Sequence, residues 1–258
     1  MTDTADQVYL LARRSVVRTM RQPANVVGPL IFPLFLLAVN SAGLRAETHL
    51  PGFPSPSILA FILAVPFIQG ALFATMNTGT DLARDIQTGF LSRLSLTPMR
   101  GAALLLGQLG GTITLGLLQA AVYVAVGTVA GVRFKSGVPG LLVLLVFYTL
   151  VVLAFGAVGL FAALRTGSGE AIQSLFPAFF VFLFISSMAI PRNLMSVEWF
   201  RDVATVNPVS YLIEGVRSLI VIGWDLEALA LGFAIAAAVA VIAIALAARS
   251  LGDRLARS

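Results

Sequence analysis

The sequence predicts an all-α membrane protein with six transmembrane helices, and three observations support this class. Hydrophobic residues make up 58% of the 258 residues and charged residues only 11%, whereas soluble proteins have about 45–50% and about 25%. The mean hydropathy is +0.94, and so apolar a chain cannot cover a globular surface with polar groups. Six stretches of about 20 residues without Asp, Glu, Lys or Arg are long enough to cross a hydrocarbon core of roughly 30 Å. Soluble, disordered and nucleic-acid-binding classes are excluded, despite a sequence pI near 10.4.

The segment before the first span, residues 1–23, is predicted to be an amphipathic interfacial helix. Val8, Ala12, Val16 and Met20 recur at helical spacing on one stripe, and arginines occupy the other side. Such a helix can hold its arginines against anionic lipid headgroups. A simple positively charged anchor and a helix that binds a partner are both consistent with this pattern.

The six apolar stretches are expected to cross the membrane in alternating directions. Prolines inside several of them predict kinks, where a neighbouring polar group must satisfy the freed carbonyls. The third and fourth stretches are longer than the bilayer requires, which predicts tilt or protrusion. The expected spans are residues 24–40, 57–78, 102–131, 138–164, 171–190 and 228–248.

The distribution of basic residues predicts the orientation of these spans. Eleven of the 17 Lys and Arg residues lie on the side of the two termini and six on the other side. Because the more basic loops of a membrane protein remain in the cytoplasm, we expect both termini there. The protein is then a multi-pass protein of the plasma (inner) membrane.

The chain lacks the side chains on which most catalytic and metal sites depend. It has no Cys, one His (His49) and one Lys (Lys135), which excludes thiolate zinc sites, histidine metal clusters and Ser-His relays. Lys135 follows Phe134, where a phosphate-binding loop would need glycine. We therefore expect no catalytic residue, no metal and no cofactor on this chain, and no enzymatic activity of its own.

A loop expected in the cytoplasm, residues 79–100, follows the second span and is predicted to contain a short amphipathic helix. Leu82, Ile86 and Phe90 are spaced to share one face of that helix, and a Thr-Pro pair marks the break before the third span. The helix could lie at the membrane surface or insert into the groove of a partner.

A second non-spanning segment, residues 191–225, precedes the sixth span on the other side. Asn207 is predicted to cap a helix that has Pro208 at its first position. The helix is too short to cross the bilayer. Glu214 and Arg217 are one turn apart on it, and we expect them to pair with each other or to face water inside the protein. These features predict a short re-entrant helical hairpin.

Polar and aromatic side chains inside the spans are candidates for a substrate path. The more frequent role of such amides is hydrogen bonding between helices, and that of the phenylalanines is packing or contact with lipid. The candidates are Gln69, Asn77, Gln119, Phe176 and Phe180.

Two motifs outside the spans carry a resemblance to a known family. One is Arg84-Asp85-Ile-Gln-Thr-Gly89 through Leu94 with Thr97-Pro98, and the other is Asn207-Pro208-Val-Ser-Tyr211-Leu-Ile-Glu214-Gly-Val-Arg217. In both, the chain resembles the type-2 permeases of ATP-binding-cassette exporters, especially the daunorubicin-resistance-like branch. The resemblance covers nearly the whole chain, and the second motif is the more specific.

The resemblance implies a six-span half-transporter that dimerises, with itself or with a paralogue, and binds two copies of a separate ATPase subunit. ATP and Mg²⁺ would then bind to that partner, membrane lipids would surround the chain, and nucleic acid is not a partner. It also implies that the N-terminal helix and the loop after the second span contact the ATPase, and that re-entrant helices cap the pathway. The implied coupling residues are Leu82, Arg84, Asp85, Ile86, Gln87, Phe90, Leu91 and Arg93, and the implied gate residues are Asn207, Pro208, Tyr211, Glu214 and Arg217.

The function expected from these features is ATP-driven export of an amphipathic or lipophilic substrate, drug-like or lipid-like, from the cytoplasm or inner leaflet. The family includes exporters of drugs, lipids and polysaccharides, so the resemblance does not name the substrate. Three alternatives belong to other classes. A passive channel needs no ATPase, and an ion-coupled carrier needs a carboxylate inside the membrane, which the spans lack. A lipid-modifying enzyme would have only carboxylates such as Asp81 and Asp85 to work with.

Overall fold

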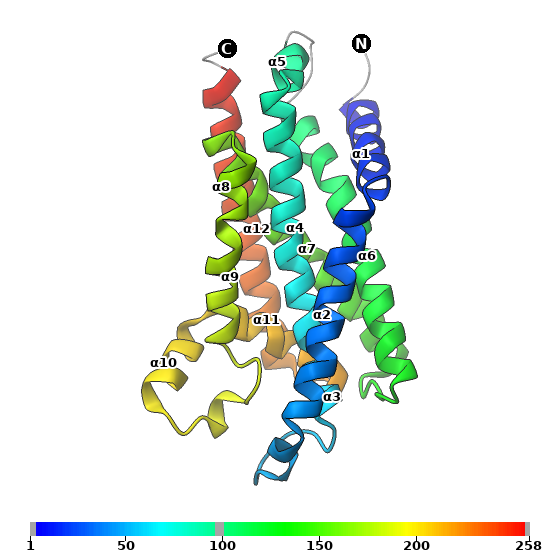
Figure 1. Cartoon of the computed structure of the whole chain (residues 1–258), viewed down its shortest axis with the longest axis vertical. Helices are drawn as coiled ribbons and strands as arrows, with labels where there is room; N and C mark the ends of the chain where they lie inside the picture. The colour runs from blue at the N-terminus through cyan, green and yellow to red at the C-terminus, as the bar shows by residue number, and fades with distance from the viewer. Residues whose placement is uncertain (1–3, 96–100, 256–258) are drawn as a thin grey trace.

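The computed structural model describes residues 4–95 and 101–255, and within these ranges it is built of helices without a strand. Five helical stretches in the described ranges are long and apolar enough to cross a membrane. They run side by side along the long axis of the molecule (Figure 1). Their helices are α2 (Pro23–Gly43), α3 (Ile58–Ile62) continued by α4 (Ala64–Gln87), α6 (Gly101–Val129), α7 (Gly137–Thr166) and α12 (Leu226–Leu255).

Shorter helices occupy the two ends and one side of this bundle. The end with the first turns of α1, with α5 and with the last turns of α12 is called the α5 end, and the end with α3, α10 and α11 is called the α11 end (Figure 1). The shorter helices are α1 (Thr4–Met20), η1 (Arg45–His49), α5 (Phe90–Ser95), α8 (Gly169–Gln173), α9 (Leu175–Phe184), η2 (Arg192–Leu194), α10 (Glu198–Val206), α11 (Pro208–Arg217) and η3 (Ser218–Ile222).

The expected fifth span, residues 171–190, differs most from the sequence prediction. The structure has a shorter apolar segment over Gly169–Phe184, which is broken between α8 and α9, and the chain is no longer helical from Ile185. Pro177 explains the break, because it has no N–H to donate to the carbonyl of Gln173 four residues earlier. The segment runs alongside α4 (Figure 1). It is shorter than the expected fifth span and is not one continuous helix.

The loop expected at residues 79–100 is also different. α4 continues as one helix to Gln87, and after a turn at Gly89 the short α5 follows. Leu82 is fully buried, so that the apolar period read as a loop helix is the continuation of the second span. The predicted end of that helix, Thr97-Pro98, lies outside the described residues.

α4 is the centre of the bundle and is buried along most of its length. It packs most extensively against α7, and the two backbones approach closely at Gly159. A Cβ at this position would collide with the backbone carbonyl oxygen of Thr75, so only glycine permits this approach. Helices α2, α6, α8 and α11 also contact α4. A displacement of α4 therefore reaches nearly every part of the bundle.

The expectation that polar side chains would satisfy carbonyls freed by proline is confirmed in α2. Pro29 and Pro33 lie inside this helix, and each leaves the carbonyl four residues earlier without a helical hydrogen bond. Asn77 of α4 donates its Nδ2 to the carbonyl of Asn25 at 3.1 Å. The Tyr123 hydroxyl of α6 donates to the carbonyl of Pro29 at 2.8 Å. These two bonds hold a weakly buried helix against the bundle.

Replacing Tyr123 with phenylalanine is expected to lower the free energy of unfolding by about 1 kcal/mol, because a buried carbonyl then loses its strongest donor. In a Pro33→Ala background the loss should be smaller, since the new backbone N–H at position 33 can bond the same carbonyl of Pro29. Thermal unfolding of the four variants in detergent measures both effects. An equal loss in the two backgrounds would contradict the role assigned to the hydroxyl.

Candidate functional site

A network of buried and partly buried charges joins three helices near the α5 end. We call Arg14, Arg18, Asp81, Asp85 and Gln108 the Asp85 network. Asp85 is 4% exposed and accepts two hydrogen bonds from Arg14, at 2.9 and 2.8 Å, and one from Arg18 at 2.9 Å. The Gln108 Nε2 donates to it at 2.9 Å, and Arg18 also pairs with Asp81 at 3.0 Å. The carboxylate of Asp85 thus has both of its oxygens occupied by α1 and α6.

The network follows from matched spacing on two helices. Arg14 and Arg18 are four residues apart on α1, and Asp81 and Asp85 are four residues apart on α4, so that each pair lies on one helix face. The hydrogen bonds from Arg14 to Asp85 raise the pKa of Arg14 above its ordinary value and outweigh the opposing effect of burial. This arginine therefore stays charged at any physiological pH.

The expected placement of the α1 arginines against lipid headgroups is wrong for two of them. Arg14 and Arg18 bind carboxylates of α4 instead, whereas Arg13 and Arg21 are exposed. Sequence periodicity showed that these residues share a face, but the acidic partners are about 70 positions away in the chain.

Close packing fixes α1 to α6 as well. The Ser15 hydroxyl donates to the carbonyl of Gln108 at 3.0 Å, and the backbone N–H of Gly111 donates to the same hydroxyl at 3.2 Å. A Cβ at Gly110 would lie 2.9 Å from the Cα of Ala12, too close for any side chain. The N-terminal helix is therefore packed into the bundle and does not lie loosely on a surface.

The implied coupling residues separate into an exposed and a buried group. Arg84, Gln87 and Arg93 are exposed, and the Gln87 Nε2 donates to the carbonyl of Gly167 at 3.1 Å. Phe90 is half-buried beneath the guanidinium of Arg14, which lies 4.0 Å from the centre of its ring. Three of the remaining four are buried within the chain and one is partly buried: Leu82, Asp85, Leu91 and Ile86.

An exposed apolar face over Leu82 and Ile86 was expected, and the structure contradicts it. Both side chains pack into an apolar cluster that includes Ile172 and Leu164. What this end of α4 offers to a partner is charged and polar.

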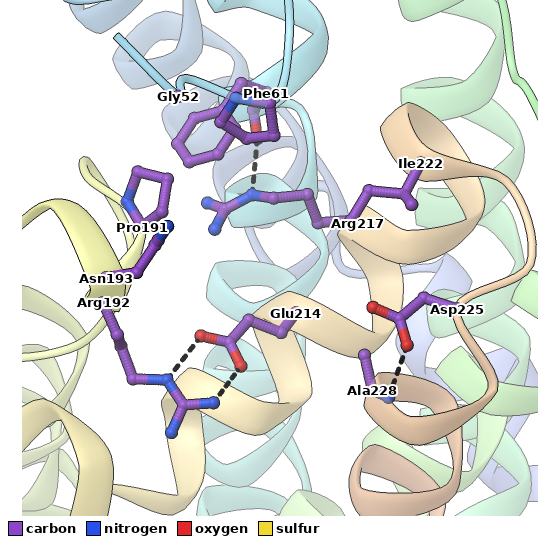
Figure 2. A pocket seen from close by; sticks show the side chains of 11 residues that line it. Gly52, Phe61, Pro191, Arg192, Asn193, Glu214, Arg217, Ile222, Asp225 and Ala228 are labelled. Atoms are coloured by element: carbon purple, nitrogen blue, oxygen red, sulfur yellow. Dashed lines mark hydrogen bonds and ion pairs between the residues drawn. The ribbon is translucent and has the colours of Figure 1, made fainter. Parts of the chain in front are cut away.

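The α11 end contains a charged cavity of about 410 Å³ (Figure 2). Glu214 lies in its wall and accepts hydrogen bonds from Arg192 at 2.9 and 2.5 Å. The guanidinium of Arg192 also lies 4.4 Å from the ring centre of Tyr211. Burial disfavours the charge of Arg192, but its hydrogen bonds to Glu214 prevail and raise its pKa. Of the two arrangements expected for Glu214 and Arg217, the direct pair is not formed, because Glu214 binds Arg192 of η2, whereas both residues do line an internal cavity.

Arg217 lines the same cavity with its guanidinium directed between Phe61 and Pro191 (Figure 2). It is 3% exposed and donates to three carbonyls, those of Phe61 (3.2 Å), Ser187 (3.0 Å) and Met188 (3.0 Å). Ser187 and Met188 follow the end of α9, where carbonyls have no helical partner. Arg217 thus supplies hydrogen-bond donors to carbonyls that have no helical partner, because the fifth apolar segment is interrupted after α9.

The predicted start of α11 is confirmed. The Asn207 Oδ1 accepts from the backbone N–H of Val209 at 3.0 Å, and Pro208 is the first residue of α11. The Nδ2 of Asn207 donates to the carbonyls of Phe182 and Ile185 at 2.5 and 3.1 Å. The same residue therefore caps α11 and closes the end of α9. α11 is mostly buried and α10 mostly exposed.

The candidate path residues divide by chemistry. The amides hold helices together: Asn77 binds α2 as described, and Gln119 donates to the carbonyl of Pro29 at 3.4 Å and accepts from the Tyr148 hydroxyl at 3.1 Å. Gln69 is 1% exposed, and its Oε1 has no hydrogen-bond partner among the described residues.

The two phenylalanines belong to a cluster of aromatic rings from α2, α4 and α9. Phe176 contacts Phe73 and Phe180, and Phe180 contacts Phe32. Phe32 also contacts Phe73. Both candidates are half-buried, so their part in a path stays a prediction.

Within the described residues, no group of three or more His, Cys, Asp or Glu side chains could hold a metal ion.

Residues 6–221 match a family model described as "ABC-2 type transporter". The chain is 25% identical over 215 residues to the "Probable doxorubicin resistance ABC transporter permease protein DrrC" of Mycobacterium tuberculosis (strain CDC 1551 / Oshkosh), which covers 82% of this chain and 75% of the relative. It is 29% identical over 199 residues to the "Daunorubicin resistance ABC transporter permease protein DrrB1" of Streptomyces coeruleorubidus, with 75% and 66% covered. The matched residues include the whole Asp85 network and the cavity residues Arg192, Glu214 and Arg217, whereas three other residues of the cavity wall, Ile222, Asp225 and Ala228, follow the match.

Proposed function

Since the chain belongs to the ABC-2 type transporter family, we propose that it exports an amphipathic or lipophilic substrate from the cytoplasm or the inner leaflet. The chain is an integral membrane permease and not an enzyme, and ATP hydrolysis belongs to a separate subunit. The proposal concerns how that ATPase drives this chain, where the substrate passes, and how the subunits are arranged.

The Asp85 network carries the proposal for coupling. It joins α1 to α4 and α6, and three polar side chains of the last turn of α4 and of α5 are exposed at the same end, those of Arg84, Gln87 and Arg93. We place the contact with the ATPase on this surface. A push on α1 is transmitted to α4 through hydrogen-bonded ion pairs, which resist a change of geometry more than apolar contacts do, and α5 contacts the same network where Phe90 lies beneath Arg14. α4 then carries the movement toward the α11 end, about 36 Å away for its 24 residues.

The cluster of phenylalanines from α2, α4 and α9 supports a path for an apolar or aromatic substrate. The names of the two relatives mention resistance to doxorubicin and to daunorubicin, and a polycyclic aromatic drug is suited to stack against Phe176 and Phe180. Because α2 is the least buried of the candidate spans, the side of the bundle with α2 and α9 is also where a substrate could enter from the lipid.

The proposed complex contains two copies of the permease and two ATPase subunits that bind ATP and Mg²⁺. α2 presents large apolar side chains to its surroundings, among them Ile31 and Phe35, each 60% exposed. Lipid or the second permease copy would cover them. The α5 end, with both termini, is proposed to face the cytoplasm, in agreement with the surplus of basic residues on that side.

Transport in vesicles tests the proposal. The permease, purified with the ATPase subunit that it retains, is reconstituted with doxorubicin as the fluorescent probe. We expect uptake into inside-out vesicles that requires ATP and both subunits. Uptake without the ATPase would indicate a passive channel, and uptake driven by an ion gradient would indicate a carrier. Either result would contradict the proposal.

A further inference from the structure

We call the charged cavity of the α11 end the outer cavity, and a flap covers one side of it. We define it as residues 189–206, which include η2 and α10 and leave the bundle between Met188 and Asn207. Its ends are fixed, because Arg217 holds the carbonyl of Met188 and Asn207 holds the end of α9. Between these ends, the polar bonds from the flap to the rest of the described chain are few. They are the pair of Arg192 with Glu214 and a hydrogen bond from the Tyr211 hydroxyl to the carbonyl of Thr205.

Arg217 is the second relevant feature, because it is a buried cation that forms no ion pair with the described part of the chain. None of the ion pairs in the described residues includes it. Its three acceptors are neutral carbonyls. A guanidinium has five N–H groups, so two remain for a further acceptor. Glu214 is three residues earlier on α11, which is the spacing at which a carboxylate and a guanidinium of one helix meet.

We propose that Glu214 exchanges partners, binding Arg192 when the flap is closed and Arg217 when the flap is open. The structure shows the closed arrangement (Figure 2). If the flap moved away without an exchange, the carboxylate of Glu214, whose side chain is 20% exposed, would lose its only ion-pair partner among the described residues. Arg217 offers a replacement without any movement of α11. The exchange lowers the free-energy cost of opening, while Arg217 keeps the flap attached at Met188.

This inference depends on the proposed function only for its purpose, which is to open the outer end during export. The exchange itself concerns this chain alone. Its tests need neither an ATPase nor a substrate, so that failure of the vesicle transport assay would leave them interpretable.

The first test measures access to the cavity. Ala228 lies in the cavity wall, and because the chain contains no Cys, Ala228→Cys is a reporter without background. An Arg192→Gln change should increase its rate of reaction with an impermeant thiol reagent by roughly tenfold, which corresponds to about 1.4 kcal/mol. The matched control is Arg201→Gln, which removes the same charge from α10 of the flap and should leave the rate unchanged. If the thiol introduced at position 228 reacts at the same rate in the Arg192→Gln variant and in the protein that retains Arg192, the pair of Arg192 with Glu214 does not hold the flap closed, and the proposal is overturned.

The second test distinguishes an exchange from simple opening. In the parent protein, Glu214→Gln should lower the unfolding temperature by about 2–4 °C, because the pair with Arg192 is lost. In the Arg192→Gln background, Glu214→Gln should lower it again, because Glu214 is then bound to Arg217. A carboxylate without a second partner gives the opposite result, since its neutralisation would leave stability unchanged or increase it. That outcome would overturn the exchange.

Discussion

Replacing Asp85 with asparagine is expected to release α1 from α4 and to lower the free energy of unfolding by about 3 kcal/mol. The carboxylate binds Arg14, Arg18 and Gln108 at once, and its removal leaves the charge of Arg14 without a partner. The lower end of the usual range for a broken buried pair applies, because the side chain of Arg14 is 36% exposed. Export should be lost as well, since α1 and α4 no longer move together.

Thermal unfolding in detergent and export in vesicles measure the two effects. Asp81→Asn is the matched control, because Asp81 makes a single ion pair with Arg18 and Arg18 keeps Asp85 as a partner. It should cost clearly less stability than Asp85→Asn. Equal losses in the two variants would show that the network does not depend on Asp85.

Reversing the charge of Arg84 is expected to abolish export without unfolding the permease. The side chain of Arg84 is exposed, and its guanidinium forms no hydrogen bond or ion pair with the described residues. Arg84→Glu should therefore change the free energy of unfolding by less than about 0.5 kcal/mol. At the rim of a docking surface, by contrast, it places like charges together and costs several kcal/mol of binding.

Vesicles that contain both subunits separate these effects. Arg84→Glu should reduce export to background and uncouple or depress ATP hydrolysis that is stimulated by substrate. Arg133→Glu, the same reversal at an exposed position of the α11 end, serves as the control and should leave export unchanged. Export at the normal rate with Arg84→Glu would leave only a surface role for this part of α4.

Local rules explain which features could be predicted from the sequence. The cap of α11 depends on Asn207 and Pro208, which act within two residues of each other, and it was predicted correctly. The freed carbonyls of α2 could be predicted because proline always removes the same hydrogen bond, although the partners Asn77 and Tyr123 could not be identified.

The charged contacts depend on the tertiary structure, and their partners could not be identified from the sequence. For Glu214, the spacing on the helix indicated either a pair with Arg217, three residues away, or contact with internal water, but the partner in the structure is Arg192, 22 residues away. The choice is decided by the interruption after α9, which presents carbonyls to Arg217. In the sequence, Asp85 stands among residues expected to contact a partner. Only the packing of α1 against α4 shows that this carboxylate binds Arg14 within the chain.

Cross-linking from the α5 end is the most direct test of the central claim that a separate ATPase docks beside the Asp85 network. Single cysteines are introduced as Arg93→Cys at this end and Arg133→Cys at the α11 end, both at exposed positions of a chain that has no other Cys. Each is labelled with a photoreactive thiol reagent in the purified complex. The account predicts a cross-linked product with the ATPase from position 93 and none from position 133. A product from position 133 alone would contradict it.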